Sequence, residues 1–286
     1  MAKMERVTVS ARAKVNFTLD ILGSEGGYHL LDSLVCTINL SDRVTARRRA
    51  DKRVCVTIGG VGADDIPPGN NALRAAQAFL QAFGTQGADI FIERHIPVGA
   101  GLGSSSADAA GVLRALAKLY GASDMVRLKA LADGLGSDTG YLLTGGWARM
   151  TGRGDRIAPV ADMPPLYLLL LCPPSGVATA QCFAEYDRRG ERYPARTQAA
   201  IDLLRREGAR GARLFGNALT QAAASLNGEV AAALEAAAAL CASGAGMTGS
   251  GSACYAVFGS ARACRAAAAR YAGGAAALCV HTVPTA

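Results

Sequence analysis

A glycine- and serine-rich stretch in the first half of the chain constrains the fold more than any other feature. Glycine stands at every second position and serines follow, in the order Pro97-Val98-Gly99-Ala100-Gly101-Leu102-Gly103-Ser104-Ser105-Ser106. Glycine adopts backbone dihedrals that side chains forbid, and it lets the backbone approach a ligand closely. Leucines then recur at helical spacing as far as Tyr120, and Gly121 ends the pattern. The stretch therefore predicts a tight loop that leads directly into a long helix.

The start of this helix is a predicted anion-binding site. Free backbone N–H groups and the positive end of the helix dipole both favour negative charge there. We also expect Ser105 and Asp108, which fit S-x-x-D, to form a capping box at the first turn. A shorter glycine motif would indicate an ordinary strand–turn–helix connection, but glycines this regular, followed by serines, favour a loop that binds nucleotide phosphates.

Two common nucleotide-binding motifs are excluded by the same stretch. A Walker loop requires G-x-x-x-x-G-K-[ST], and no lysine follows a glycine anywhere in the chain. The dinucleotide motif G-x-G-x-x-G also fails, because serines occupy the position of its last glycine. A phosphate loop here must be of another kind.

The rest of the chain alternates predicted strands and helices. Hydrophobic periodicity indicates strands at residues 7–10, 15–22, 35–40, 43–47, 54–58, 88–93, 166–172 and 253–258. It indicates helices at 70–83, at 124–134 behind Ser123 as cap, and at 230–242, with two arginine-bearing helices before the last of these. The composition changes near Arg153, so we expect two lobes, residues 1–153 and 154–286.

Composition restricts the class of protein. Half of the 286 residues are hydrophobic and 19% are charged, which excludes a disordered chain. The formal charge of +7 favours anionic partners, while aromatic residues at 6% argue against a nucleic-acid surface. The run Arg47-Arg48-Arg49 is interpreted as a solvated strand end, with anion binding as the alternative.

Segment lengths and cysteines indicate a soluble protein of the cytoplasm. The N-terminus lacks the apolar segment of a secretory signal, and the longest apolar run, 166–172, is far shorter than the ~20 residues that span a bilayer. We expect no membrane partner. The eight cysteines form no C-x-x-C pair and are expected to be buried, reduced thiols: Cys36, Cys55, Cys172, Cys182, Cys241, Cys254, Cys264 and Cys279.

Two further segments supply groups suited to phosphoryl transfer. Lys14 and Asn16 lie at the edge of an early predicted strand, and Asp138 follows a predicted helix. Transfer of a phosphoryl group to an alcohol needs an oriented hydroxyl and an acceptor for its proton, which a carboxylate beside a lysine can supply. Taken singly, Asp138 is typical of a helix cap and Lys14 of a surface lysine, so the prediction depends on their coming together.

These segments resemble the motifs of the GHMP kinases. The stretch from Pro97 to Ala110 is similar to the family's phosphate-binding motif, Ala13-Lys14-Val15-Asn16 to its N-terminal motif, and Gly246 to Ala253 to its C-terminal glycine motif. The resemblance covers nearly the whole chain. It implies an α+β fold with an S5-like N-terminal lobe and a ferredoxin-like C-terminal lobe, and it implies an ATP-dependent small-molecule kinase that uses Mg²⁺.

One branch of the family is especially similar to this chain. The tripeptide Gly27-Tyr28-His29, the segment 40–44 and the segment 135–138 are typical of the branch that phosphorylates the 2-hydroxyl of a cytidine-diphosphate-linked polyol, a methylerythritol, in non-mevalonate isoprenoid biosynthesis. The substrate would be this small molecule, and the protein would be a monomer or a weak dimer.

The resemblance also implies roles for individual residues. Asp138 would be the base, with Lys14 beside it at the transferred group, and Asn16 would contact the polyol or diphosphate end. ATP would be bound by Asn71 near the adenine and by Pro97, Gly99, Gly101, Leu102, Gly103, Ser104, Ser105 and Ser106. The substrate would be bound by Tyr28 and Phe183 on either side of the cytosine, His29 at its edge, Thr179 near the diphosphate, and Gly249 and Ser250. The metal ligands are not assigned.

Departures from the branch leave two alternatives open. Ser104 and Ser105 stand where the branch carries more glycine, Gly26 replaces the usual aspartate, and the residues that flank Asp138 differ. A GHMP kinase acting on mevalonate, homoserine or a sugar would fit the serine-rich loop. A non-catalytic nucleotide- or RNA-binding protein would account for the arginine excess.

Overall fold

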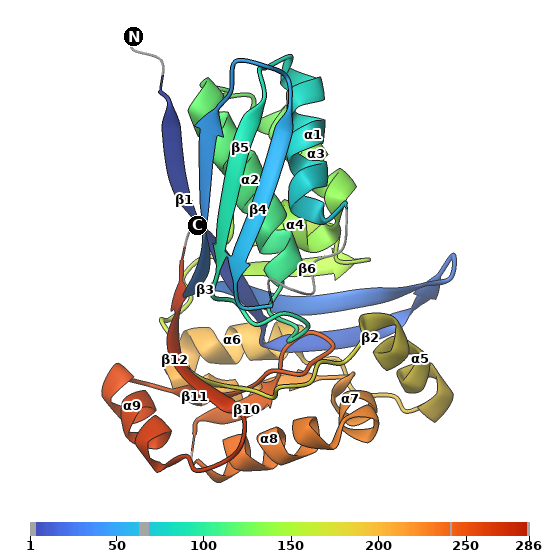
Figure 1. The fold of residues 1–286 in the computed structure, drawn as a ribbon. Coiled ribbons are helices and arrows are strands. Elements are labelled where there is room, and N and C mark those ends of the chain that lie inside the picture. The colour runs from blue at the N-terminus through green and yellow to red at the C-terminus, as the bar shows by residue number, and fades with distance from the viewer. Residues whose placement is uncertain (1–3, 63–68, 241, 285–286) are drawn as a thin grey trace.

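Two lobes, one above the other, make up the molecule (Figure 1). This computed structural model describes residues 4–62, 69–240 and 242–284. The strands are β1 (Arg6–Asn16), β2 (Thr18–Glu25), β3 (Tyr28–Arg48), β4 (Val54–Gly60), β5 (Ala88–Arg94), β6 (Ala148–Gly152), β7 (Arg156–Pro159), β8 (Tyr167–Cys172), β9 (Gly216–Asn217), β10 (Gly244–Met247), β11 (Cys254–Phe258) and β12 (Ala276–Val283).

The helices alternate with these strands along the chain. They are α1 (Asn71–Phe83), α2 (Ser104–Tyr120), α3 (Met125–Leu135), α4 (Ser137–Leu142), α5 (Thr179–Arg189), α6 (Thr197–Glu207), the 3-10 helix η2 (Gly208–Leu214), α7 (Thr220–Leu226), α8 (Gly228–Ala239) and α9 (Ala261–Arg270).

Strand β3 is the long central strand of the N-terminal lobe. Its 21 residues pair in turn with β2, β6, β1, β12 and β5, and β5 pairs with β4 in parallel. The separate strands predicted at 35–40 and 43–47 are therefore one strand, because β1 pairs along both parts and carries the ladder past Ser41 and Asp42. Helix α2 packs against α1, β1 and β3, which places its first residues at the lower end of this sheet.

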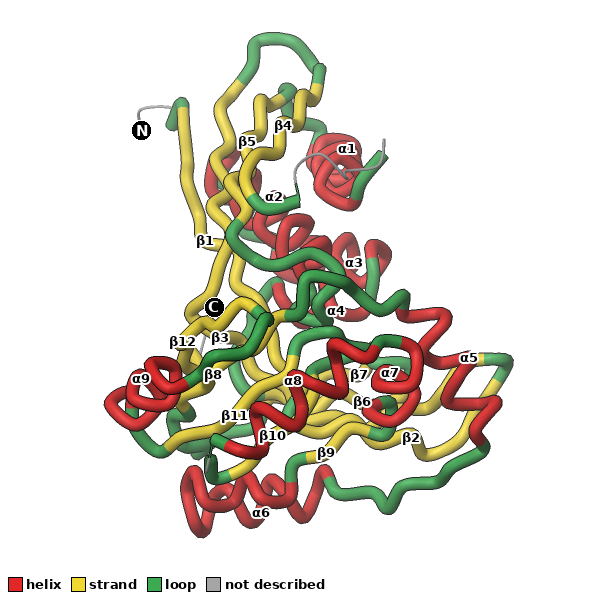
Figure 2. The backbone as a smooth tube through the Cα atoms, turned by 60° about the horizontal axis from the view of Figure 1, so that its bottom comes forward, coloured by secondary structure: helices red, strands yellow, loops and turns green. Residues whose placement is uncertain are grey.

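The C-terminal lobe has the ferredoxin-like arrangement that the family resemblance implies. Its chain order is β8, helices, β10, β11, α9, β12, and its sheet order is β10-β11-β8-β12, all antiparallel. Helices α8 and α9 pack on this sheet, α8 on β10 and β11 and α9 on β8 and β12. Figure 2 shows α6 away from them, beside the β2 and β9 end of the sheet. This is the β-α-β-β-α-β order of that fold.

Aromatic side chains from both lobes meet at their junction. Phe17 stacks on Trp147 with ring centroids 4.9 Å apart, and it also contacts Phe215 and Tyr255 from the C-terminal half of the chain. The larger hydrophobic core continues through this cluster from one lobe into the other. The predicted boundary at residues 153 and 154 stays a prediction, because the sheet and the core are continuous across it.

The helix starts differ from the predicted caps. Helix α2 begins behind Gly103, and no side chain caps it. The capping box is wrong, because the Asp108 carboxylate turns inward and accepts hydrogen bonds from Arg94. Helix α3 is capped by Asp124 rather than Ser123, since the Asp124 side chain accepts from the Arg127 N–H. Helix α8 begins at Gly228, two residues before the predicted start.

The cysteine prediction holds in part. Cys36, Cys172, Cys182, Cys254 and Cys264 are buried and free, but Cys55 and Cys279 are exposed. Cys55 is exposed because β4 pairs with β5 alone, at the edge of the sheet, and its side chains alternate in exposure. Cys241 lies outside the described residues.

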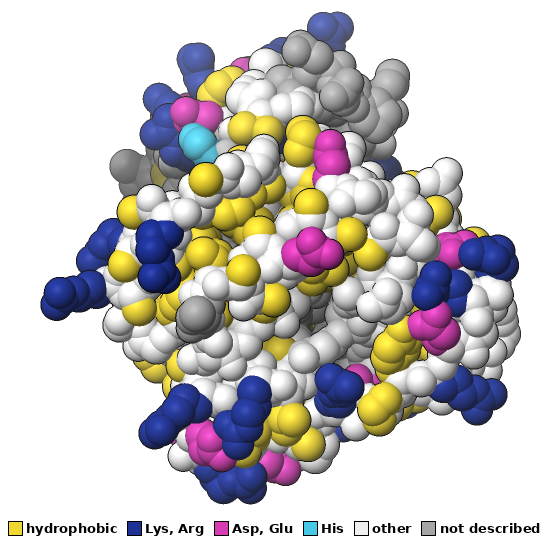
Figure 3. Space-filling model, turned by 90° about the horizontal axis from the view of Figure 1, so that it is seen from below, with side chains coloured by type: hydrophobic (Ala, Val, Ile, Leu, Met, Phe, Trp, Pro, Cys, Tyr) yellow, Lys and Arg dark blue, Asp and Glu magenta, His cyan; other side chains and the backbone are white. Residues whose placement is uncertain are grey.

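Many of the arginines contact acidic or aromatic side chains close to them. Arg47 is exposed as predicted, but Arg48 lies 4.3 Å from the centre of the Tyr120 ring and Arg49 is bonded to Asp51 and Asp89. Figure 3 shows the underside, where blue side chains are scattered and several adjoin magenta ones. The ion pairs Arg188–Glu185, Arg189–Glu191 and Arg213–Glu207 are examples of such local pairing. Among the helices described, none is long and apolar enough to cross a membrane.

Candidate active site

A cavity of about 370 Å³ lies where the two lobes meet. Its wall is formed by the end of β1, the glycine–serine loop, the starts of α2, α4 and α5, and the turn between β10 and β11. The predicted site residues that line it are Lys14, Asn16, Pro97, Gly99, Gly101, Leu102, Gly103, Ser104, Ser105, Ser106, Asp138, Thr179, Phe183, Gly249 and Ser250. Segments more than 200 residues apart in sequence are thereby brought to one site.

The glycines of the loop are required by its backbone. Gly99, Gly101 and Gly103 have φ of 69°, 73° and 77°, the left-handed region that side chains avoid. A Cβ on Gly101 would lie 2.1 Å from the Thr248 carbonyl oxygen, so the loop and the β10–β11 turn touch backbone to backbone. Glycines without side chains also line the cavity, so a ligand can approach the main chain closely on that side.

The first turn of α2 points at the cavity. Ser104, Ser105 and Ser106 begin this 17-residue helix and line the cavity. The first N–H groups of a helix have no partner within it, and the positive end of the dipole adds to their attraction for an anion. The absence of a side-chain cap behind Gly103 leaves this end open to phosphate oxygens.

Lys14 and Asp138 form an ion pair in the wall of the cavity. The Lys14 Nζ lies 3.6 Å from the Asp138 Oδ2, with the lysine side chain 5% exposed and the aspartate 35%. Asp138 is the second residue of α4, whose cap is Gly136, so Asp138 lies in the first turn and is not the helix cap. A carboxylate that is partly open to the cavity, beside a buried ammonium group, can accept a proton from an alcohol while the lysine stabilises developing negative charge.

A chain of hydrogen bonds positions Lys14. Its Nζ donates to the Asn16 side-chain oxygen, and the Asn16 amide donates to the Ser33 hydroxyl at 2.8 Å. Ser33 in turn donates to the Thr18 carbonyl. The sequence did not single out Ser33, because a lone serine inside a strand has no distinguishing pattern.

Thr248 joins the motifs that the sequence treated separately. Its hydroxyl accepts from the Asn16 N–H at 2.9 Å and donates to the Gly101 carbonyl at 3.2 Å. Asn217, from β9, donates to the Met247 and Gly249 carbonyls and holds the same turn from below. Thr248 was within the predicted glycine motif, but its role was missed, whereas nothing in the sequence marks Asn217.

The predicted aromatic pair does not enclose a free space in this structure. His29, rather than Tyr28, lies on the Phe183 ring, with centroids 4.8 Å apart and planes 29° from parallel. The His29 Nε2 and the Asp187 Oδ1 are 2.8 Å apart. Tyr28 is 57% exposed, and its ring is covered by the Arg153 guanidinium at 4.1 Å. A base could enter between the rings once His29 moves off Phe183.

Of the remaining predicted residues, Thr179 and Ser250 line the cavity and Asn71 does not. Asn71, at the start of α1, donates to the Ser105 hydroxyl at 3.1 Å but does not line the cavity. The Thr179 and Ser250 hydroxyls are 3.0 Å apart and both line it. Arg153, at the predicted lobe boundary, also lines the cavity, and its guanidinium lies over the Tyr28 ring.

Known proteins share both halves of this arrangement. Residues 70–146 match the GHMP kinases N terminal domain and residues 198–273 match the GHMP kinases C terminal domain. The 4-diphosphocytidyl-2-C-methyl-D-erythritol kinase of Pelotomaculum thermopropionicum is 36% identical over 271 residues, 93% of each chain. That of Cereibacter sphaeroides is 38% identical over 271 residues, 90% of this chain and 91% of the other.

Solved structures agree with these relatives. A crystal structure of 4-(cytidine 5'-diphospho)-2C-methyl-D-erythritol kinase superposes with a TM-score of 0.81 at 31% identity, covering 97% of this chain and all of the other. Homoserine kinase from Cytophaga hutchinsonii gives 0.70 at 19% identity over 100% and 96% of the two chains, which shows a shared fold. With an open helix start, a facing Lys14–Asp138 pair and relatives that match over nearly its whole length, the chain belongs to the GHMP kinase superfamily, as an ATP-dependent small-molecule kinase in the family of 4-diphosphocytidyl-2-C-methyl-D-erythritol kinases.

Proposed function

We propose that this protein transfers the γ-phosphoryl group of ATP to the 2-hydroxyl of 4-diphosphocytidyl-2-C-methyl-D-erythritol, a step of non-mevalonate isoprenoid biosynthesis. The observation that carries the proposal is the pair of Lys14 and Asp138 beside the open start of α2, in a chain whose relatives carry this enzyme's name. The donor and the acceptor hydroxyl would meet between these groups.

In the reaction, Asp138 removes the proton of the acceptor hydroxyl. The hydroxyl oxygen forms a bond to the γ-phosphorus, and the bond from that phosphorus to the β,γ-bridging oxygen breaks as ADP leaves. The Lys14 ammonium, which is held by Asn16, stabilises the negative charge on the transferred group. The N–H groups at the start of α2 hold the ATP phosphates in line with the acceptor.

The cavity is suited to magnesium bound mainly by ATP. Among the described residues, no three His, Cys, Asp or Glu side chains gather into a metal site. Magnesium in kinases needs no such cage, since it uses one or two carboxylates together with substrate phosphates and water. Asp138 is the acidic side chain that lines this cavity. Because Asp138 is the base, the ion would be held mainly by the phosphates and water. When bound with ATP, the ion would neutralise part of the charge of the phosphates.

Substrate recognition would use the part of the cavity that Thr179 and Phe183 line. Phe183 and Tyr28 are aromatic surfaces for the cytosine, and His29 carries donor and acceptor atoms for its edge. Thr179 and Ser250 hydroxyls, with Arg153, lie where the diphosphate of the substrate would pass. These assignments favour a nucleotide-linked acceptor over a small free alcohol.

We infer a cytoplasmic enzyme without a nucleic-acid or membrane partner. The cysteines Cys36, Cys172 and Cys182 are free thiols, as expected in a reducing compartment. Several arginines are already bonded to acidic neighbours, which leaves less of the positive charge for a polyanion. A monomer or weak dimer remains our expectation.

An acceptor panel tests the function. The purified protein is given ATP and magnesium with the cytidine-linked methylerythritol, mevalonate or homoserine, and ADP release is followed by a coupled assay. We expect turnover with the first acceptor, and a new phosphate monoester on the tertiary carbon by phosphorus NMR. Turnover with mevalonate or homoserine instead would assign the protein to another GHMP activity, and a folded sample inactive with all three would refute the proposal.

A binding experiment tests the recognition of cytosine separately. We expect CDP to bind to the wild-type protein and to bind at least about tenfold more weakly after His29→Ala, because one base-edge hydrogen bond is worth about 1.5 kcal/mol or more when a buried partner is left unpaired. Unchanged CDP affinity would show that His29 does not contact the base.

A further inference from the structure

Three buried charged residues lie beneath the glycine–serine loop. Arg94 ends β5 and is 7% exposed, Asp42 is in β3 and is 0% exposed, and Asp108 is in α2 and is 1% exposed. We call these three residues the loop clasp. Buried charges are costly unless they are paired and hydrogen-bonded, so the arrangement of their atoms matters.

Asp42 holds the chain just before the loop. Its Oδ1 accepts hydrogen bonds from the backbone N–H groups of His95 at 2.6 Å and Ile96 at 2.8 Å. Pro97, the first residue of the loop, follows directly. The entry to the loop is therefore fixed to β3 by one carboxylate oxygen.

Asp108 holds the helix that follows the loop. Its Oδ2 accepts from the Arg94 Nε at 2.8 Å and from the Arg94 Nη2 at 2.6 Å. Because Asp108 is in the second turn of α2 and Arg94 is at the end of β5, this ion pair ties the exit of the loop to the strand that leads into it.

The other carboxylate oxygens of the clasp face each other. Asp42 Oδ2 and Asp108 Oδ1 are buried and have no hydrogen-bond donor from the described residues. The two carboxyl groups nevertheless lie within hydrogen-bond reach of each other. Two carboxylates opposite one guanidinium would leave a net negative charge in the interior and two oxygens in repulsion. A single proton between them removes both problems.

We propose that Asp42 and Asp108 share one proton, and that this proton closes the loop clasp and holds the glycine–serine loop in the shape that binds ATP phosphates. Asp42 and Asp108 are thus positioning residues, which act through the loop and do not touch the substrate. The inference rests on the proposed binding of ATP phosphates by this loop.

The surroundings favour the protonated pair. Burial raises the pKa of Asp108 to about 7, against the opposing effect of Arg94, and burial also raises the pKa of Asp42. Arg94 is the cation that touches the pair. The other charged groups next to it in sequence, Arg43 and Glu93, are bonded to each other at the surface, and the His95 side chain is 52% exposed beside Glu93. They are screened by water and oppose the proton weakly.

Loss of the shared proton has a defined direction. When pH rises past the upper pKa of the pair, the second carboxylate becomes charged and repels the first. The Asp42 and Asp108 sides of the clasp then separate, and the loop between them loses its fixed ends. Nucleotide affinity falls with rising pH, by up to about tenfold per pH unit, the limit for one linked proton.

Carbon-13 NMR of the aspartate carboxyl groups detects the proton without any nucleotide. We expect one carboxyl signal that stays protonated far above the ordinary aspartate range, which lies near pH 4, and that is lost in Asp108→Asn. Full ionisation of both Asp42 and Asp108 by pH 5 would overturn the proposal. This measurement stands even if the protein binds no ADP, an outcome that would refute the proposed function instead.

The pH dependence of ADP affinity tests the effect on the loop. In Asp108→Asn the amide donates permanently to Asp42 while its oxygen still accepts from Arg94, so we expect the alkaline loss of affinity to disappear. Comparison with the wild type at each pH cancels the titration of the nucleotide itself. Asp32→Asn is the matched control, because Asp32 is also bonded to one arginine, Arg149, but away from the loop, and it should keep the wild-type dependence. If Asp108→Asn does not fold, Asp42→Asn provides the same test. A variant with the wild-type alkaline loss would overturn the clasp.

Discussion

At the scale of single residues, the site is built from side chains that are ordinary on their own. Lys14 and Asp138 acquire a role because β1 and the start of α4 bring them within 3.6 Å beside the phosphate loop. Surface pairs of the same chemistry occur elsewhere, such as Lys129 with Asp133 on α3 at 2.7 Å. What distinguishes Lys14 is its burial, since a desolvated ammonium acts on a neighbouring charge more strongly than one in water.

This contrast provides the first prediction. We expect Asp138→Asn to lower kcat by about 10²- to 10⁴-fold, because the amide cannot accept the hydroxyl proton. The affinity for ADP, measured by calorimetry, should change by less than about twofold, since the carboxylate acts in the chemical step. Asp133→Asn removes the surface carboxylate and should leave both values unchanged. Equal loss of affinity and kcat in Asp138→Asn would show that Asp138 has a structural role.

At the scale of elements, the phosphate loop depends on backbone geometry more than on side chains. Gly101 combines a positive φ with a close approach to the β10–β11 turn. A Cβ at this position would collide with the Thr248 carbonyl oxygen. Gly121, at the end of α2, has nearly the same φ of 69° but nothing within 4 Å of its missing Cβ. The two glycines therefore separate the effect of dihedral strain from the effect of contact.

We expect Gly121→Ala to cost about 1–2 kcal/mol of unfolding free energy through strain alone, with nucleotide affinity unchanged. Gly101→Ala bears the same strain and also drives the loop away from the Thr248 carbonyl, so ADP affinity should fall at least about tenfold. Denaturant unfolding and calorimetry measure the two effects. Equal ADP affinity in both variants would mean that the close contact of the two turns is irrelevant to binding.

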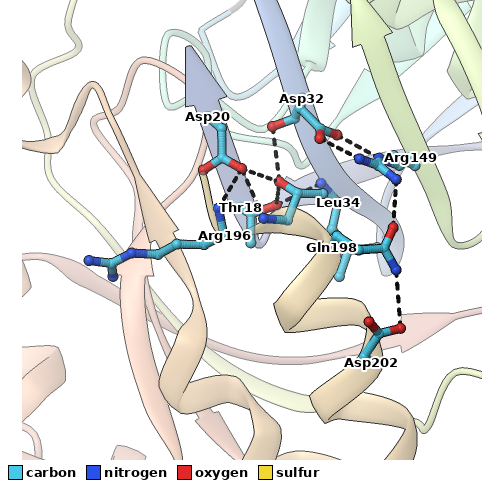
Figure 4. A network of polar contacts seen from close by, with 9 residues as sticks. Thr18, Asp20, Asp32, Leu34, Arg149, Arg196, Gln198 and Asp202 are labelled. Carbon is cyan, nitrogen blue, oxygen red and sulfur yellow. Dashed lines mark hydrogen bonds and ion pairs between the residues drawn. The ribbon is translucent and has the colours of Figure 1, made fainter. Parts of the chain in front are cut away.

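At the scale of the whole molecule, a polar network fastens the lobes together behind the site (Figure 4). Asp20, on β2, accepts hydrogen bonds from the N–H groups of Arg196 and Thr197 at 2.8 and 2.9 Å. These bonds hold the start of α6 against β2. Arg149, on β6, bridges Asp32 on β3 to Gln198 on α6. Contacts from three strands of the upper lobe thus fix one helix of the lower lobe.

The network should be important for stability. We expect Asp20→Ala to lower the free energy of unfolding by about 1–3 kcal/mol, because it leaves buried N–H groups at the start of α6 without an acceptor. Asp202→Asn, at the exposed end of the same network, should change it by less than about 0.5 kcal/mol. Urea unfolding of the folded variants measures both. A loss in Asp20→Ala no larger than in Asp202→Asn would show that solvent replaces the carboxylate.

The sequence predicted the helices and strands better than the contacts between them. Helices at 70–83 and 124–134 and strands at 166–172 and 253–258 were confirmed within a residue or two, because hydrophobic periodicity is a local signal. The predictions of separate strands at 35–40 and 43–47 and of a capping box with Asp108 were wrong, because the pairing of β3 and the contact of Asp108 with Arg94 depend on partners distant in sequence. Strands β9 and β10 were not predicted, since short, glycine-rich strands carry no period.

The glycine–serine loop with its following helix, the family and the candidate status of Lys14 and Asp138 came from the sequence alone, since glycine spacing and the order of motifs are written along the chain. The tertiary structure decided which of those residues meet, that Thr248 links the glycine turns, that His29 rests on Phe183, and that Asp42 and Asp108 face each other beneath the loop. The physical reason is that hydrogen bonds and buried charges act over a few ångströms of space, whatever the separation of the residues in sequence.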